Sequence, residues 1–203
     1  MIEKGRSMMK FLKKHSYEII RLFVIQIGMT IFSLIVTTTA SMAFEDKGGA
    51  DVAKLAVSIF AIGFHMFVVY TTMWEVGFKR QEKLELGREP QDALFGGKIA
   101  FVANIPNLIL SLLMVIGLLR LVSESSFFIG LFGIARLIDG FLNATYLGLI
   151  GYLLPSSTNA LYYILTAVLC LASVLPAIIV SQIACRLGEK NIRLTKGKAP
   201  SLE

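Results

Sequence analysis

Seven polar or charged side chains lie within or directly beside long apolar stretches of this sequence. They are Glu75, His65, Asn104, Asn107, Ser111, Arg136 and Asp139. In a membrane such side chains are costly unless they find a partner or line a water-filled cavity, so they often mark the pathway of an ion or a solute. We therefore take them as the candidate binding residues, and the chemistry they indicate is proton or solute handling more than bond cleavage.

Three of these residues form a polar stripe. Asn104, Asn107 and Ser111 recur at spacings of three and four residues, which places them on one face of one helix. Pro106 removes a backbone hydrogen bond inside the stripe and predicts a bend. We predict a polar path from the cytoplasmic face toward the middle of the membrane, lined by this stripe and by the histidine and glutamate of the preceding helix. Hydrogen bonding between packed helices is the alternative explanation.

Two charged pairs are spaced for contact along a helix. Arg136 and Asp139 are three residues apart, and Glu75 and Lys79 are four apart. Side chains at both spacings meet on a helix surface. We predict an ion pair in each case. For His65 two roles stay open, a packed histidine with a hydrogen-bond partner and a histidine that relays protons.

The sequence lacks the patterns of the common catalytic sites. It contains no phosphate-binding lysine loop, no HExxH and no GxSxG. Its two histidines, His15 and His65, and its two cysteines, Cys170 and Cys185, do not have the spacing of a ligand cluster. We expect no metal and no cofactor, and enzymatic activity ranks below other functions. An intramembrane enzyme acting on lipid, with the three charged candidates as its acid or electrostatic groups, remains a third hypothesis.

Long charge-free blocks must position these residues. Over 20 or more residues no Asp, Glu, Lys or Arg occurs in the blocks Leu22–Phe44, Leu55–Trp74, Ile99–Leu119 and Ala160–Cys185. About 20 apolar residues in a helix cross a hydrocarbon core of roughly 30 Å. The sequence therefore predicts an all-α, polytopic membrane helical bundle that forms a single integral membrane domain over residues 1–203. Its four full spans are expected at about 19–44, 52–77, 99–122 and 160–185.

The placement of basic residues orients these spans. They concentrate in the N-terminal segment 1–21, the loop 78–98 and the tail 186–203, which the positive-inside rule places in the cytoplasm. With four spans, segment 127–157 must then begin and end on the outer side. We predict a re-entrant or interfacial helical hairpin there, made of two short helices separated near Asp139 and Gly140. Six short or tilted spans satisfy the same parity.

These features favour a small-solute or ion transport protein, or a membrane subunit of a transporter, in the plasma membrane of a bacterium. The mixed charges of loop 78–98 support an alternative, a non-catalytic accessory subunit that docks a partner protein there. The net charge of +6 flanks the apolar blocks, so we expect membrane lipids and no nucleic acid as partners. A homodimer is compatible with this size.

Overall fold

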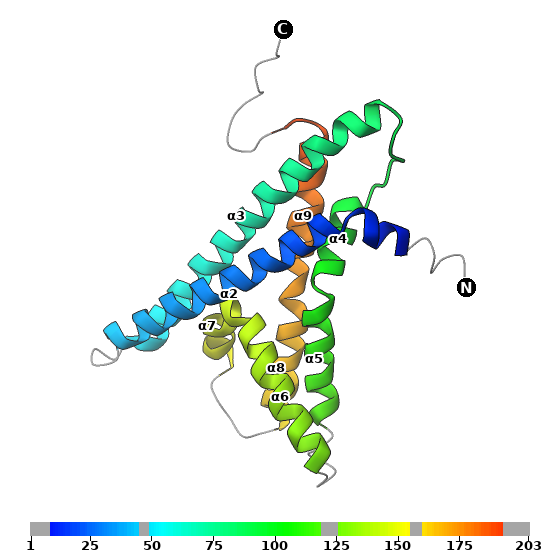
Figure 1. The fold of residues 1–203 in the computed structure, drawn as a ribbon. Coiled ribbons are helices and arrows are strands. Elements are labelled where there is room, and N and C mark those ends of the chain that lie inside the picture. Colours follow the sequence, from blue (N-terminus) through cyan, green and yellow to red (C-terminus); the bar gives the residue numbers. More distant parts are fainter. Residues whose placement is uncertain (1–8, 45–48, 119–125, 155–159, 193–203) are drawn as a thin grey trace. The chain divides into compact units, whose positions relative to one another are not determined.

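The structure is a computed structural model that describes residues 9–44, 49–118, 126–154 and 160–192. All regular secondary structure in these residues is helical. A short helical segment, 9–14, precedes the longer helices. These are α2 (Ser16–Phe44), α3 (Ala50–Glu85), α4 (Phe95–Ala103), α5 (Ile105–Gly117), α6 (Ser126–Leu142), α7 (Ala144–Leu153), α8 (Ala160–Ala172) and α9 (Val174–Glu189) (Figure 1).

Three helical stretches of the described chain are long and apolar enough to cross a membrane. They are α2, α3 and the stretch Leu161–Glu189, which joins α8 and α9. Two broken pairs, α4 with α5 and α6 with α7, raise the number to five if each pair crosses as one span. A helix satisfies its backbone hydrogen bonds internally, which is what an apolar environment requires. The prediction of an all-helical chain with the apolar helices of a multi-pass membrane protein is confirmed.

The described chain folds into two compact units. Unit 1 comprises residues 9–25, 68–103 and 178–192, and unit 2 comprises the described residues within 26–67 and 104–177. Consequently α2, α3 and α9 contribute to both units. Helix α4 belongs to unit 1, and α5 to α8 belong to unit 2.

Unit 1 packs the second half of α3 against α4 and α9. Met73, Ile99 and Ala184 form the centre of its apolar core and are 0% exposed. The backbones of α3 and α9 touch at Gly77, where an added Cβ would lie 2.1 Å from the carbonyl oxygen of Cys185. Only glycine permits this approach.

Unit 2 packs α5 against α6 and α8 around Met114, Phe132 and Ala167. Helices α6 and α7 are bent by 106° relative to each other at Asn143. The two short helices predicted in this segment are therefore present. Their break lies at Asn143, however, and not near Asp139 and Gly140, which are both inside α6.

The remaining bounds shift several predicted boundaries. Helix α3 continues to Glu85, so the connection to α4 covers only 86–94. The break between α4 and α5 lies at Asn104, just before Pro106, where the sequence predicts a bend. The expected ends of the third span at 119–122 and of the hairpin at 155–157 lie outside the described residues, as does 193–203 of the tail.

Candidate functional site

At the break between α6 and α7, backbone carbonyls accept hydrogen bonds from side chains of other helices. The N–H of Tyr146 bonds to the carbonyl of Asn143 at 2.8 Å and not to that of Leu142, its regular helical partner. The hydroxyl of Thr30, from α2, donates a hydrogen bond to the Leu142 carbonyl at 3.2 Å. A carbonyl that the break removes from the helical ladder is thus satisfied within the bundle.

Two further hydroxyls hold the first turn of α7. Ser33 Oγ, from α2, donates to the carbonyl of Ala144 at 3.3 Å, and Ser58 Oγ, from α3, donates to that of Thr145 at 2.7 Å. Both serines are buried, at 0% and 1% exposed. Side chains from α2 and α3 therefore stabilise the break, which is part of the packing of unit 2.

The side chain of Asn143 occupies the inside of the break. Its Nδ2 donates to Asn107 Oδ1 at 3.0 Å and to the Asp139 carbonyl at 3.1 Å. Its Oδ1 accepts from Ser173 Oγ at 2.6 Å and from Asn107 Nδ2 at 3.4 Å. One asparagine, 1% exposed, thereby links α5, α6 and the junction of α8 with α9.

Asp139 supplies the only carboxyl of this cluster and is 1% exposed. Its Oδ1 accepts a hydrogen bond from Ser111 Oγ at 2.5 Å, and the Cys170 thiol is also hydrogen-bonded to the carboxyl. Among the described residues Asp139 forms no ion pair. An ionised carboxylate buried without a cation costs several kcal/mol. This carboxyl is therefore suited to hold a proton or to balance the charge of a bound cation.

The predicted ion pair between Arg136 and Asp139 does not form in the structure. The guanidinium carbon of Arg136 lies 5.3 Å from the ring centroid of Tyr163 and 6.0 Å from that of Phe132. Arg136 is on the exposed side of α6, whereas Asp139 is buried. Aromatic faces attract a guanidinium, and the core offers Asp139 neutral donors, so each residue has a different partner.

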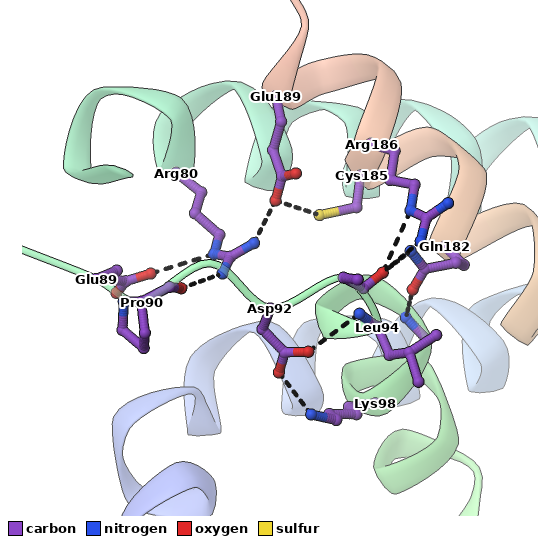
Figure 2. A network of polar contacts seen from close by, with 12 residues as sticks. Arg80, Glu89, Pro90, Asp92, Leu94, Lys98, Gln182, Cys185, Arg186 and Glu189 are labelled. Atoms are coloured by element: carbon purple, nitrogen blue, oxygen red, sulfur yellow. Dashed lines mark hydrogen bonds and ion pairs between the residues drawn. The ribbon is translucent and has the colours of Figure 1, made fainter. Parts of the chain in front are cut away.

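A second polar cluster, in unit 1, surrounds the guanidinium of Arg80 (Figure 2). Arg80 is 4% exposed. It donates to Glu89 Oε2 at 3.3 Å, to the Pro90 carbonyl at 2.9 Å and to the Glu189 carboxylate. The ring of Phe95 covers it, with the centroid 4.0 Å from Cζ. This buried cation is thus paired by two carboxylates and a carbonyl.

The same cluster holds the connection 86–94 in place. Gln182 Nε2 and Arg186 Nη2 of α9 donate to the carbonyl of Ala93 at 2.7 and 2.9 Å (Figure 2). A connection that only joined two helices would need none of these side-chain contacts.

Glu89 joins Arg80 to the N-terminal segment. Lys14 Nζ lies 2.8 Å from the second carboxylate oxygen of Glu89. Burial alone would raise the pKa of Glu89, but the hydrogen bond and charge of Lys14, with the charge of Lys83, hold the pKa below its ordinary value. Burial lowers the pKa of the neighbouring His15.

The other candidate residues have separate surroundings. Glu75, in unit 1, pairs with Lys79 at 2.7 Å, which confirms the predicted pair, and with Arg21 at 3.0 Å. His65, in unit 2, is 7% exposed, and its Nδ1 has no hydrogen-bond partner among the described residues. Asn104 is buried where α5 begins. Of the seven candidates, Ser111 bonds directly to the Asp139 carboxyl, and Asn107 is connected to Asp139 through the side chain of Asn143.

Sequence reasoning missed Asn143, Ser173 and Arg80 as members of these clusters. A signal existed for Asn143, because it follows Asp139 by one helical turn in an apolar segment. No such signal marked Arg80, which stands beside Lys79 in what looks like an ordinary basic flank of a span.

Among the described residues, no group of three or more His, Cys, Asp or Glu side chains is placed to hold a metal ion. Comparisons of this chain with protein-family models, curated proteins and solved structures give no match. The proposals about function therefore rest on the polar clusters around Asp139 and Arg80.

Proposed function

We propose that the chain is a membrane transport protein for a small solute or ion, with Asp139 as its proton-binding group. One observation carries this proposal, a carboxyl 1% exposed with only neutral hydrogen-bond partners beside a broken helix. Transporters build sites within the membrane at broken helices, and buried carboxyl groups serve there as proton relays. A purely structural bundle gains no stability from a carboxyl that is buried without a cation.

The partners of Asp139 provide a way to accommodate both protonation states. A serine hydroxyl can donate or accept a hydrogen bond. Ser111 therefore donates to the ionised carboxylate and accepts from the protonated one, and no other charged group has to move. The Asp139 carbonyl is bonded to Asn143 at the break, so proton uptake takes place directly beside the point where α6 and α7 are interrupted.

In this proposal the basic segments 1–21, 78–98 and 186–203 face the cytoplasm of a bacterium. The apolar side chains exposed on the helices, such as Ile35, Phe60 and Leu137, contact membrane lipid. The chain acts alone, as a homodimer or as the membrane subunit of a larger transporter.

Proton movement into reconstituted liposomes tests the proposal. A dye inside the liposomes reports internal pH while amino acids, sugars, carboxylic acids and monovalent cations are added outside in turn. We expect one class to drive proton movement, and Asp139→Asn to slow it at least tenfold. Glu82→Gln is the matched control, because Glu82 is an exposed carboxylate near the end of α3. Proton movement equal to that of empty liposomes for every class, or unchanged in Asp139→Asn, would overturn the proposal.

One observation favours a second function, docking of a partner protein through the connection 86–94. Arg80 and Arg186 hold this connection from within unit 1, while Leu86 and Leu94 are 56% and 58% exposed. A fixed backbone that presents apolar side chains is typical of a recognition surface. If the wild-type protein moves no protons, this function takes precedence.

A further inference from the structure

A cavity of about 470 Å³ opens in unit 2, lined by none of the polar residues that surround Asp139. Small-molecule pockets usually measure about 300–1,000 Å³. Its walls come from the first turns of α3, from α7 and from the start of α8. The residues that give it chemical character are Asp51, Lys54, Gly148, Gly151, Tyr152 and Tyr162.

Two glycines of α7 shape this cavity. At Gly148 an added Cβ would lie 2.4 Å from the carbonyl oxygen of Lys54 and 2.9 Å from Ser58 Cβ, so α7 touches the backbone of α3 there. At Gly151, nearly one helical turn later, nothing lies within 4 Å of such a Cβ. The two helices therefore meet at Gly148 and leave open space at Gly151.

The walls carry one charge of each sign. Lys54 Nζ lies 3.4 Å from Asp51 Oδ1, and the two side chains are 40% and 86% exposed. An exposed pair of this kind contributes only about 0–1 kcal/mol, so a ligand can separate it at little cost. Tyr152 and Tyr162 add aromatic rings, and α7 ends at this cavity with its carbonyl end, which favours a positive group.

We propose that this cavity binds a small zwitterion of the amino-acid class, with its carboxylate on Lys54 and its ammonium group on Asp51. When the ligand separates Lys54 from Asp51, a zwitterion gives each of them a new partner of opposite charge. A ligand with a single charge would pair with only one and leave the other wall charge unpaired. The aromatic rings and the carbonyl end of α7 favour the ammonium side of the same ligand. Its role as the transported solute rests on the proposed function, whereas its binding does not.

Equilibrium dialysis of the purified full-length protein in detergent tests the binding, with each of the common L-amino acids as probe. For any amino acid that binds, its amide and its N-acetyl derivative serve as the singly charged analogues. We expect at least one amino acid to bind and both of its analogues to bind at least tenfold more weakly. Lys54→Met and Asp51→Asn should each weaken binding at least tenfold.

A pair of glycine variants separates occupation of the cavity from a general loss of folding. Gly151→Leu places a side chain in the open space and should abolish binding. Gly130→Leu, on α6, also meets nothing within 4 Å at its Cβ and should leave binding unchanged. Absence of binding by every amino acid, equal binding of the analogues, or retained binding in Gly151→Leu would overturn the inference.

Asp139→Asn distinguishes this inference from the proposed function. This variant should bind the amino acid normally, because Asp139 does not line the cavity, but should move protons at least tenfold more slowly. Binding without proton movement in the wild-type protein would refute the proposed function alone. Proton movement driven only by solutes that are not zwitterions would refute the role of the zwitterion as the transported solute and leave the proposed function standing.

Discussion

Unit 1 and unit 2 each bury an ionisable side chain, and they compensate its charge in opposite ways. Arg80, in unit 1, meets the carboxylates of Glu89 and Glu189. Asp139, in unit 2, meets the hydroxyl of Ser111 and no cation among the described residues. Buried charges must be paired or neutralised. Unit 1 therefore contains a cation with fixed charge, whereas unit 2 contains a group whose charge can change.

This difference matches the two roles that we propose, a structural one for Arg80 and proton binding for Asp139. Full pairing at Arg80 joins α3, α9 and the connection 86–94, and its value is mechanical stability. The hydrogen-bond partners of Asp139 are neutral, so its carboxyl can gain or lose a proton without breaking an ion pair. If the comparison is valid, removing charge should destabilise unit 1 strongly and unit 2 hardly at all.

The largest effect is expected for Arg80→Met. The substitution leaves Glu189 without its cation, and it leaves Glu89, whose side chain is 6% exposed, with Lys14 as its one remaining cation among the described residues. Breaking a buried pair in this way costs about 3–5 kcal/mol. Denaturant unfolding in detergent, followed by the fluorescence of Trp74, the single tryptophan, measures the loss in unit 1. Adding Glu89→Gln and Glu189→Gln should recover part of it, and strictly additive losses would contradict the pairing.

An intermediate effect is expected from the same chemical change made in each unit. Glu89→Gln removes a charge that holds both Arg80 and Lys14 and should cost about 1–3 kcal/mol. Asp139→Asn removes a charge that no cation balances and should change stability by less than about 1 kcal/mol in either direction. Unfolding followed by helical circular dichroism near neutral pH measures both. Equal losses would remove the distinction between the two units.

The helices were predictable because their signal lies along the chain. Charge-free blocks of membrane length predicted α2, α3 and the pair α8–α9 directly. The break between α6 and α7 was predicted at the wrong residues, because Asp139 and Gly140 look like helix breakers in the sequence. Ser111, on another helix, donates a hydrogen bond to the Asp139 carboxyl, so α6 continues through this residue. The break lies at Asn143, whose side chain bonds to Asn107.

The partners within the cluster of unit 2 were not predictable, because they depend on packing. Thr30 and Ser33 donate hydrogen bonds to another helix. Thr39 and Thr166 donate to the carbonyl four residues earlier in their own helix. Nothing in the local sequence tells these hydroxyls apart. Polar residues in apolar segments could be selected as candidates, but only the fold shows which of them meet.

His15, in unit 1, is a buried side chain whose charge can also change, and we expect its effect on stability to be smaller than that of the carboxylates. Its ring packs against Phe11 and Phe95, with centroid distances of 4.9 Å in both cases. Burial lowers its pKa below the ordinary 6.5, although the nearby charges of Glu18 and Glu89 act in the opposite direction. His15 is thus a neutral group near the Arg80 cluster that acid can charge.

The smallest effect is expected for His15→Phe and concerns the pH dependence of unit 1. Between its two pKa values the folded protein binds fewer protons at His15 than the unfolded chain, so stability falls as the pH drops through about 6.5. The phenylalanine variant should lose this decline and keep the later one below about 4.5, where the unfolded chain takes up a proton at Glu89 while the folded protein, with its lowered pKa at this residue, stays charged. Unfolding followed by Trp74 fluorescence from about pH 8 to pH 5 measures the difference. A gap between variant and wild type that does not change with pH would mean that His15 keeps the same protonation in the folded and unfolded states.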